Sequence, residues 1–149
     1  MLARVNDELV RRTIESRFAT LLYGVLWDGQ LTYSSAGHNP ALIVGSGGVR
    51  RLERGGLILG AFYDASFEEE TVWLDPGDVL VVFSDGITEA LSPDGSEFGE
   101  ERLLATIRAG RELPPTRLLQ DVLDSVREFI GGADQSDDLT ALVLRYTGS

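Results

Sequence analysis

Apolar and aromatic residues form short runs in the first half of the chain, and turn-forming residues separate these runs. The run at 18–27 is rich in aromatic and β-branched residues, and the pair Asp28-Gly29 follows it. Because such a pair favours a tight hairpin turn, it predicts a hairpin whose second strand covers 31–36. The last run of this half, 79–83 (VLVVF), does not alternate and therefore predicts a strand covered on both faces. Between them, further strands are expected at 41–44, 49–52 and 67–74.

The apolar spacing changes to that of a helix in the last third of the chain. Helices are predicted at 99–109 and 115–130, and a short amphipathic helix at 2–14. The helix at 115–130 begins with a proline and is followed by Gly131-Gly132, which are typical start and stop residues. A final strand is predicted at 139–146. Strands followed by a helix pair and one more strand indicate an α+β fold, with antiparallel sheet packed by helices.

Composition narrows the classes of function. The 149 residues fit one domain, and no apolar run is long enough to cross a bilayer, so no membrane partner is expected. The chain has no cysteine, which excludes thiolate zinc sites and fits a reducing cytoplasm, where we expect the protein. Its net charge of −11 repels phosphate backbones, so nucleic acid is a poor candidate partner. An acidic protein that handles phosphate needs cations to offset its own carboxylates.

Two aspartate clusters are candidates for such cations. Asp85 directly follows the buried strand at 79–83, and Asp137-Asp138 lies between the last helix and the last strand. A carboxylate at a strand end is held rigidly and still reaches solvent. Several of them provide the oxygen ligands that Mg²⁺ and Mn²⁺ prefer. The same residues also have a simpler interpretation, since Asp-Gly after a strand commonly forms a turn and Asp137 follows Ser136 as a turn or cap residue would.

Five ordered segments decide between these interpretations. The segments are FATLLYGVLW (18–27), LTYSSAGHNPALIV (31–44), GDVLVVFSDGITEA (77–90), FGEERLL (98–104) and QSDDLTALVLR (135–145). In this order they resemble successive blocks of the SpoIIE-type branch of the PPM class, the metal-dependent serine/threonine protein phosphatases. This resemblance implies a sandwich of two antiparallel β-sheets flanked by helices, with residues 1–149 as one partial domain.

The resemblance also implies a site and a reaction. It makes Asp85 and Asp137 metal ligands, and makes Asp138 either a ligand or a residue that hydrogen-bonds to one. The implied cofactor is Mn²⁺ or Mg²⁺, as a pair of ions in a complete domain. Metal-activated water would then hydrolyse a phosphomonoester without a serine or cysteine nucleophile. The implied substrate is a phosphorylated anti-sigma-factor antagonist in partner-switching signalling, and the oligomeric state stays open.

One block of the family pattern has no counterpart in the chain. The family carries a GDVSGHG-like metal-binding stretch upstream of the helix matched here by 2–14, and the chain begins inside that helix. Asp7 within the helix and Asp28 in the hairpin turn do not replace it. We therefore expect an N-terminally truncated domain with weak or no activity and with missing edge strands. The alternative hypothesis is a PPM-like module that has lost its metal site and only binds a signalling partner.

Other polar residues have simpler predicted roles. His38, the only histidine, lies in the turn Gly37-His38-Asn39-Pro40 and is expected to satisfy local backbone groups rather than to act in catalysis. The run Glu68-Glu69-Glu70 is expected to be a solvated strand edge. Glu89 is expected either to support a metal ligand by a hydrogen bond or, as we favour, to be a carboxylate in the first turn of a helix, where the helix dipole favours negative charge.

Overall fold

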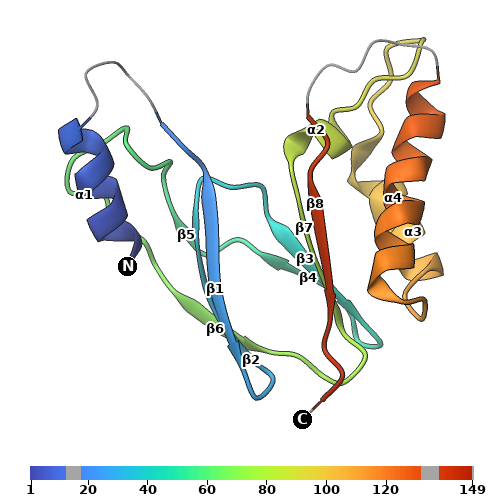
Figure 1. Cartoon of the computed structure of the whole chain (residues 1–149), viewed down its shortest axis with the longest axis horizontal. Coiled ribbons are helices and arrows are strands. Elements are labelled where there is room, and N and C mark those ends of the chain that lie inside the picture. Colours follow the sequence, from blue (N-terminus) through green and yellow to red (C-terminus); the bar gives the residue numbers. More distant parts are fainter. Residues whose placement is uncertain (13–17, 132–137, 149) are drawn as a thin grey trace. The chain divides into compact units, whose positions relative to one another are not determined.

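The structure is a computed structural model that describes residues 1–12, 18–131 and 138–148. The chain divides into two compact units, one of residues 1–40 and 51–75 and the other of residues 41–50 and 76–147. Each unit contains helix and a largely antiparallel sheet, which confirms the predicted α+β class. The helices are α1 (Leu2–Arg12), α2 (Asp85–Thr88), α3 (Gly99–Ala109) and α4 (Pro115–Ile130) (Figure 1). The strands are β1 (Leu21–Trp27), β2 (Gln30–Ala36), β3 (Ala41–Gly45), β4 (Gly48–Leu52), β5 (Gly55–Gly56), β6 (Glu70–Trp73), β7 (Val79–Phe83) and β8 (Ala141–Arg145).

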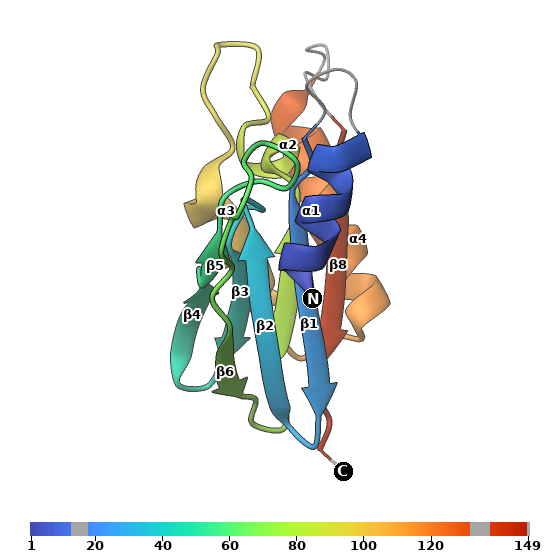
Figure 2. The ribbon, with the colours of Figure 1, turned by 90° about the vertical axis from the view of Figure 1, so that its left-hand side faces the viewer.

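The first unit is built around the predicted hairpin. β1 and β2 pair antiparallel, and the turn residues Asp28 and Gly29 have φ angles of 47° and 75°, the left-handed values that this turn requires. On β2, β6 pairs antiparallel and β5 pairs parallel. Figure 2 shows α1 lying over the start of β1, where its buried Leu2 packs with Ala36 and Leu59.

The strand predicted at 67–74 is shorter than expected. β6 covers only Glu70–Trp73, opposite Gln30–Tyr33 of β2, and the Glu68 N–H donates instead to the Gly55 carbonyl. Glu70 is not simply solvated, because it accepts a hydrogen bond from the Tyr33 hydroxyl. Burial, together with this hydrogen bond, raises the pKa of Tyr33.

The second unit places a buried strand at the centre of its sheet. β7 lies between β3 and β8 and pairs antiparallel with both. Four of its five residues are buried, as its unalternating sequence predicts. Helices α3 and α4 lie side by side against this sheet (Figure 1), and α4 turns one apolar stripe toward the core. The buried residues of that stripe are Leu118, Val122, Val126 and Ile130.

The longest helix, α4, has 16 residues. Within the part of the chain that the structure describes, no helix combines the length and the apolar character needed to cross a bilayer.

Candidate metal centre

Asp85 stands where the central strand of the second unit ends. β7 ends at Phe83, Ser84 remains extended, and Asp85 begins the four-residue helix α2. The Asp85 carbonyl accepts hydrogen bonds from the Glu89 N–H (2.8 Å) and the Thr88 hydroxyl (3.2 Å). The backbone is thus fixed while the carboxylate is exposed, with Oδ1 accepting the Gly86 N–H at 3.0 Å. The pair Asp85-Gly86 therefore begins a short helix rather than forming an isolated turn.

A second acidic segment lies against this strand end. The Ser84 N–H donates to the Thr140 carbonyl at 2.9 Å, one residue beyond the last ladder pair of Phe83 and Ala141. The Ser84 hydroxyl donates to the Asp138 carbonyl at 3.0 Å and accepts the Thr140 N–H at 3.1 Å. Asp138 is itself exposed. These hydrogen bonds hold the segment that contains Asp138 against Ser84, the residue that precedes Asp85. Figure 1 shows α2 at the end of β7 where β8 begins.

Only part of the predicted ligand set can be placed. Asp137 lies outside the described residues, whereas Asp85 and Asp138 lie within them. Over residues 1–12, 18–131 and 138–148, no three acidic or histidine side chains gather closely enough to hold a metal ion. The two carboxylates fit Mg²⁺ or Mn²⁺ in kind, because both ions prefer oxygen ligands, but they are fewer than an octahedral ion takes.

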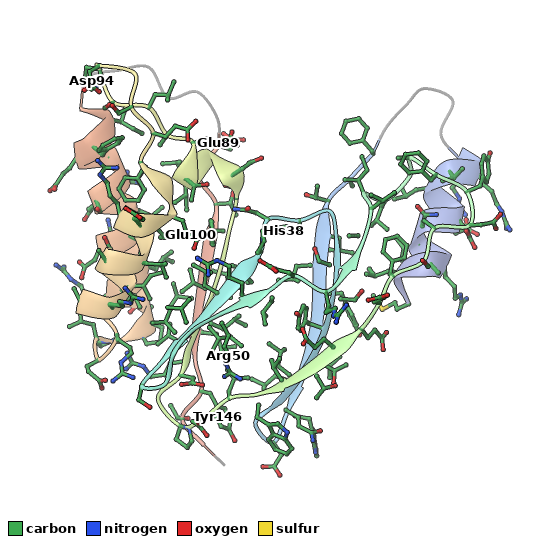
Figure 3. All side chains as sticks on the ribbon, turned by 180° about the vertical axis from the view of Figure 1, so that it is seen from behind. His38, Arg50, Glu89, Asp94, Glu100 and Tyr146 are labelled. Carbon is green, nitrogen blue, oxygen red and sulfur yellow. The ribbon has the colours of Figure 1, made fainter. Side chains whose placement is uncertain are left out.

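The two other candidate side chains have local roles. His38 Nδ1 lies 2.7 Å from the Asn39 carbonyl, and the His38 carbonyl accepts the Ser35 hydroxyl at 3.3 Å. This turn agrees with the expectation that the ring satisfies nearby backbone groups. The favoured expectation for Glu89 is wrong, because α2 begins at Asp85 and ends after one turn, which makes Glu89 its C-cap residue. Figure 3 shows Glu89 at this end of α2.

Ser84 is the residue of this region that sequence reasoning did not single out. Its contacts depend on the register between β7 and β8, which a single sequence does not reveal. The only local sign is its position between a buried strand and Asp85. A correct pairing of Phe83 with Ala141 would have placed Ser84 opposite Thr140.

Comparison with known protein families tests the resemblance that the sequence predicts. A family model described as Stage II sporulation protein E (SpoIIE) matches residues 1–147. The chain belongs to the SpoIIE family. The predicted resemblance is thereby confirmed.

Individual relatives agree with this membership. Protein IcfG of Synechocystis is 35% identical over 130 residues, covering 85% of this chain and 20% of that protein. The phosphoserine phosphatase RsbU of Bacillus subtilis is 28% identical over 156 residues, covering 97% of this chain and 44% of RsbU. The chain thus spans less than half the length of either protein.

A solved structure supports the fold. The phosphatase domain of the cell-fate determinant SpoIIE from Bacillus subtilis, presoaked with Mn, superposes with a TM-score of 0.64 at 21% identity. The match covers 97% of this chain and 64% of that domain. At this identity the likeness establishes the fold, which agrees with the implied pair of antiparallel-rich sheets with helices.

Proposed function

We propose that this chain is part of a metal-dependent phosphoprotein phosphatase domain, in which Asp85 and Asp137 are metal ligands. One observation carries the proposal: the segments that bear Asp85 and Asp138 lie together at one end of β7, joined through Ser84. Asp137 precedes Asp138 in the sequence and lies outside the described residues, so its role as a ligand rests on the family resemblance. The Mn-presoaked phosphatase domain of the SpoIIE relative supports a divalent cation as the cofactor.

The proposed chemistry divides between the cation and the chain. When bound, Mg²⁺ or Mn²⁺ would act as a Lewis acid and lower the pKa of a water molecule so that it attacks phosphorus. The chain would hold the ligands: Gly86 N–H fixes one Asp85 oxygen, and the single turn of α2 fixes its backbone. Asp138 would serve as a further ligand or hydrogen-bond to one. Because the chain carries a net charge of −11, the cations would also reduce its repulsion of a phosphate dianion.

We propose a phosphorylated serine or threonine on an anti-sigma-factor antagonist as the substrate, within partner-switching signalling. The support is membership of the SpoIIE family and the likeness to RsbU, a phosphoserine phosphatase.

A second candidate is a module that binds a signalling partner without catalysis. One observation favours it: the described residues supply two carboxylates at the strand end rather than a complete cage. This module would bind the same phosphoprotein but release no phosphate.

Phosphate release separates the two candidates. We would measure Mn²⁺-dependent hydrolysis of p-nitrophenyl phosphate and of a phosphorylated antagonist, both by this chain and by a form extended with the residues encoded upstream. The phosphatase proposal expects hydrolysis that requires Mn²⁺, disappears with EDTA and is strongest in the extended form. A matched control is Asp124→Asn, which removes one half-exposed carboxylate, paired with Arg127, from α4 of the same unit. Binding of the phosphoprotein without hydrolysis in either form would favour the binding module.

A further inference from the structure

The Ser84 hydroxyl makes two hydrogen bonds to one short segment. It donates to the Asp138 carbonyl at 3.0 Å and accepts the Thr140 N–H at 3.1 Å. A hydroxyl is among the few side-chain groups that both donate and accept, so a single serine can bridge two backbone groups that face the same side.

This bridge begins where the sheet ends. The β7–β8 ladder stops at the pair of Phe83 and Ala141, and Ser84 adds one backbone hydrogen bond to Thr140. The Ser84 carbonyl accepts the Ile87 N–H at 3.1 Å, and the Thr140 N–H donates to the serine hydroxyl. The hydroxyl therefore holds the chain against the end of the sheet for two residues beyond Thr140, as far as Asp138.

We propose that Ser84 is a positioning residue, whose hydroxyl holds the segment 138–140 against the end of β7 and thereby keeps the ligands of the two segments in register. This inference rests on the proposed function, because it concerns the same ligands. Ser84 contacts the backbone of the acidic segment rather than the reacting groups. It acts on metal binding by reducing the freedom of segment 138–140, so that Asp138 stays close to the strand end that carries Asp85.

The chain offers a matched control for this bridge. The Ser92 hydroxyl lies 3.0 Å from the Ser96 carbonyl and accepts the Ser96 N–H at 3.1 Å, which resembles the bridge of Ser84, although Ser92 also hydrogen-bonds to the Asp94 carboxylate. The loop that it closes carries neither Asp85 nor Asp138. Ser92→Ala therefore removes a serine bridge of the same kind, together with its hydrogen bond to Asp94, without changing the proposed site.

The experiment compares Ser84→Ala, Ser84→Thr and Ser92→Ala in the full chain. Amide hydrogen exchange in the metal-free protein, read by NMR at Thr140 and Ser96, reports each bridge directly. Mn²⁺ affinity, measured by calorimetry, reports its effect on the site. In Ser84→Ala we expect Thr140 to exchange roughly five to ten times faster and Mn²⁺ to bind about tenfold more weakly. Ser84→Thr keeps the hydroxyl and should restore both values, and Ser92→Ala should change only the exchange of Ser96.

Two results would overturn the role of Ser84. Unchanged exchange at Thr140 in Ser84→Ala would show that the hydroxyl does not hold the segment. Faster exchange with unchanged Mn²⁺ affinity would show that the bridge does not serve the site. A different result, no Mn²⁺ binding by the unsubstituted protein, would count against the proposed metal site itself and would remove the positioning role with it, whereas the exchange data would still show whether the bridge forms.

Discussion

Two aspartates lie at opposite ends of β7, and their surroundings differ in almost every respect. Asp78 directly precedes the strand and is 5% exposed, whereas Asp85 follows the strand by two residues and is exposed. With about 3.3 Å per residue, the two positions are roughly 20 Å apart along the strand direction. Aspartate thus occurs in a buried and in an exposed environment at the two ends of one strand.

At the Asp78 end, the charge is neutralised by the protein. Asp78 Oδ2 forms an ion pair with the Arg50 guanidinium at 3.1 Å, and the carboxylate packs against Gly45 so closely that a Cβ there would lie 1.9 Å from Oδ1. Figure 3 shows the labelled Arg50 and Tyr146 in this part of the second unit. The Tyr146 N–H donates to the Asp78 carbonyl at 3.0 Å, which ties the end of the chain to this corner.

At the Asp85 end, no cationic side chain forms a salt bridge with the carboxylate within the described ranges. Buried carboxylates require a partner inside the protein, but exposed ones do not, and they can recruit a cation from solution. The difference teaches that a strand-end aspartate alone does not indicate a metal site. The informative features are its exposure and the acidic segment that the neighbouring strand brings to it.

The largest effect is expected from Asp85→Asn. Asparagine keeps the acceptor for Gly86 N–H but removes the charge that would bind the cation, so Mn²⁺-dependent phosphate release by the extended form should fall by about 100-fold or more. Since the side chain is exposed, the free energy of unfolding should change by less than about 0.5 kcal/mol. Steady-state kinetics and urea unfolding measure the two quantities. Retained activity would remove Asp85 from the ligand set.

Gly45→Ala should produce the reverse pattern at the other strand end. The new methyl group would overlap the Asp78 carboxylate and disturb its ion pair, which should lower the free energy of unfolding by about 1–3 kcal/mol. Gly47→Ala is the matched control, because a Cβ at Gly47 meets no atom within 4 Å. Equal stability of the two variants in urea unfolding would show that the Asp78 corner is not tightly packed.

A smaller change in activity is expected from Asp138→Asn. If Asp138 supports a ligand rather than binding the cation itself, Mn²⁺-dependent activity should fall by about tenfold. A loss as large as that of Asp85→Asn would instead make Asp138 a direct ligand. The comparison of the two variants by kcat/KM at saturating Mn²⁺ therefore ranks the two carboxylates.

The smallest effect is expected from Arg50→Met. The Arg50 side chain is 46% exposed and is therefore screened by water, but its removal takes one partner from the buried Asp78 carboxylate, so the free energy of unfolding should fall by about 1 kcal/mol. Arg54→Met breaks an ion pair whose two side chains are both more than half exposed and should cost less. Thermal or urea unfolding of both variants tests this order, and a greater loss in Arg54→Met would refute it.

The sequence predicted the long elements well. The helix at 115–130 was predicted with the observed bounds because its buried residues recur at helical spacing between Pro115 and Gly131. The bounds of a strand were predicted poorly where pairing with a neighbouring strand determines them. β6 is limited to Glu70–Trp73 because only those residues oppose β2. The helix α2 was missed because four residues are too few to show a helical period.

The candidate site could be predicted only in part, because it also depends on how the strands pair. Asp85 could be located because it follows an apolar run that had to be a buried strand. Its approach to Asp138 depends on the register of β7 with β8 and on a side-chain hydrogen bond from Ser84, and neither leaves a periodic trace in the sequence. The roles of Asp85, Asp137 and Asp138 in metal binding stay predictions that the experiments above test.

The central claim is that a divalent cation binds at the Asp85 end of β7 and not at the Asp78 end. Titration of ¹⁵N-labelled protein with substoichiometric Mn²⁺ tests it most directly, because a paramagnetic ion broadens the amide signals nearest to its site. We predict that the signals of residues 84–88 and 138–140 broaden first, while those of Gly45, Arg50 and Asp78 stay sharp. Broadening that begins around Asp78, or that spreads evenly over the exposed acidic residues, would contradict the account.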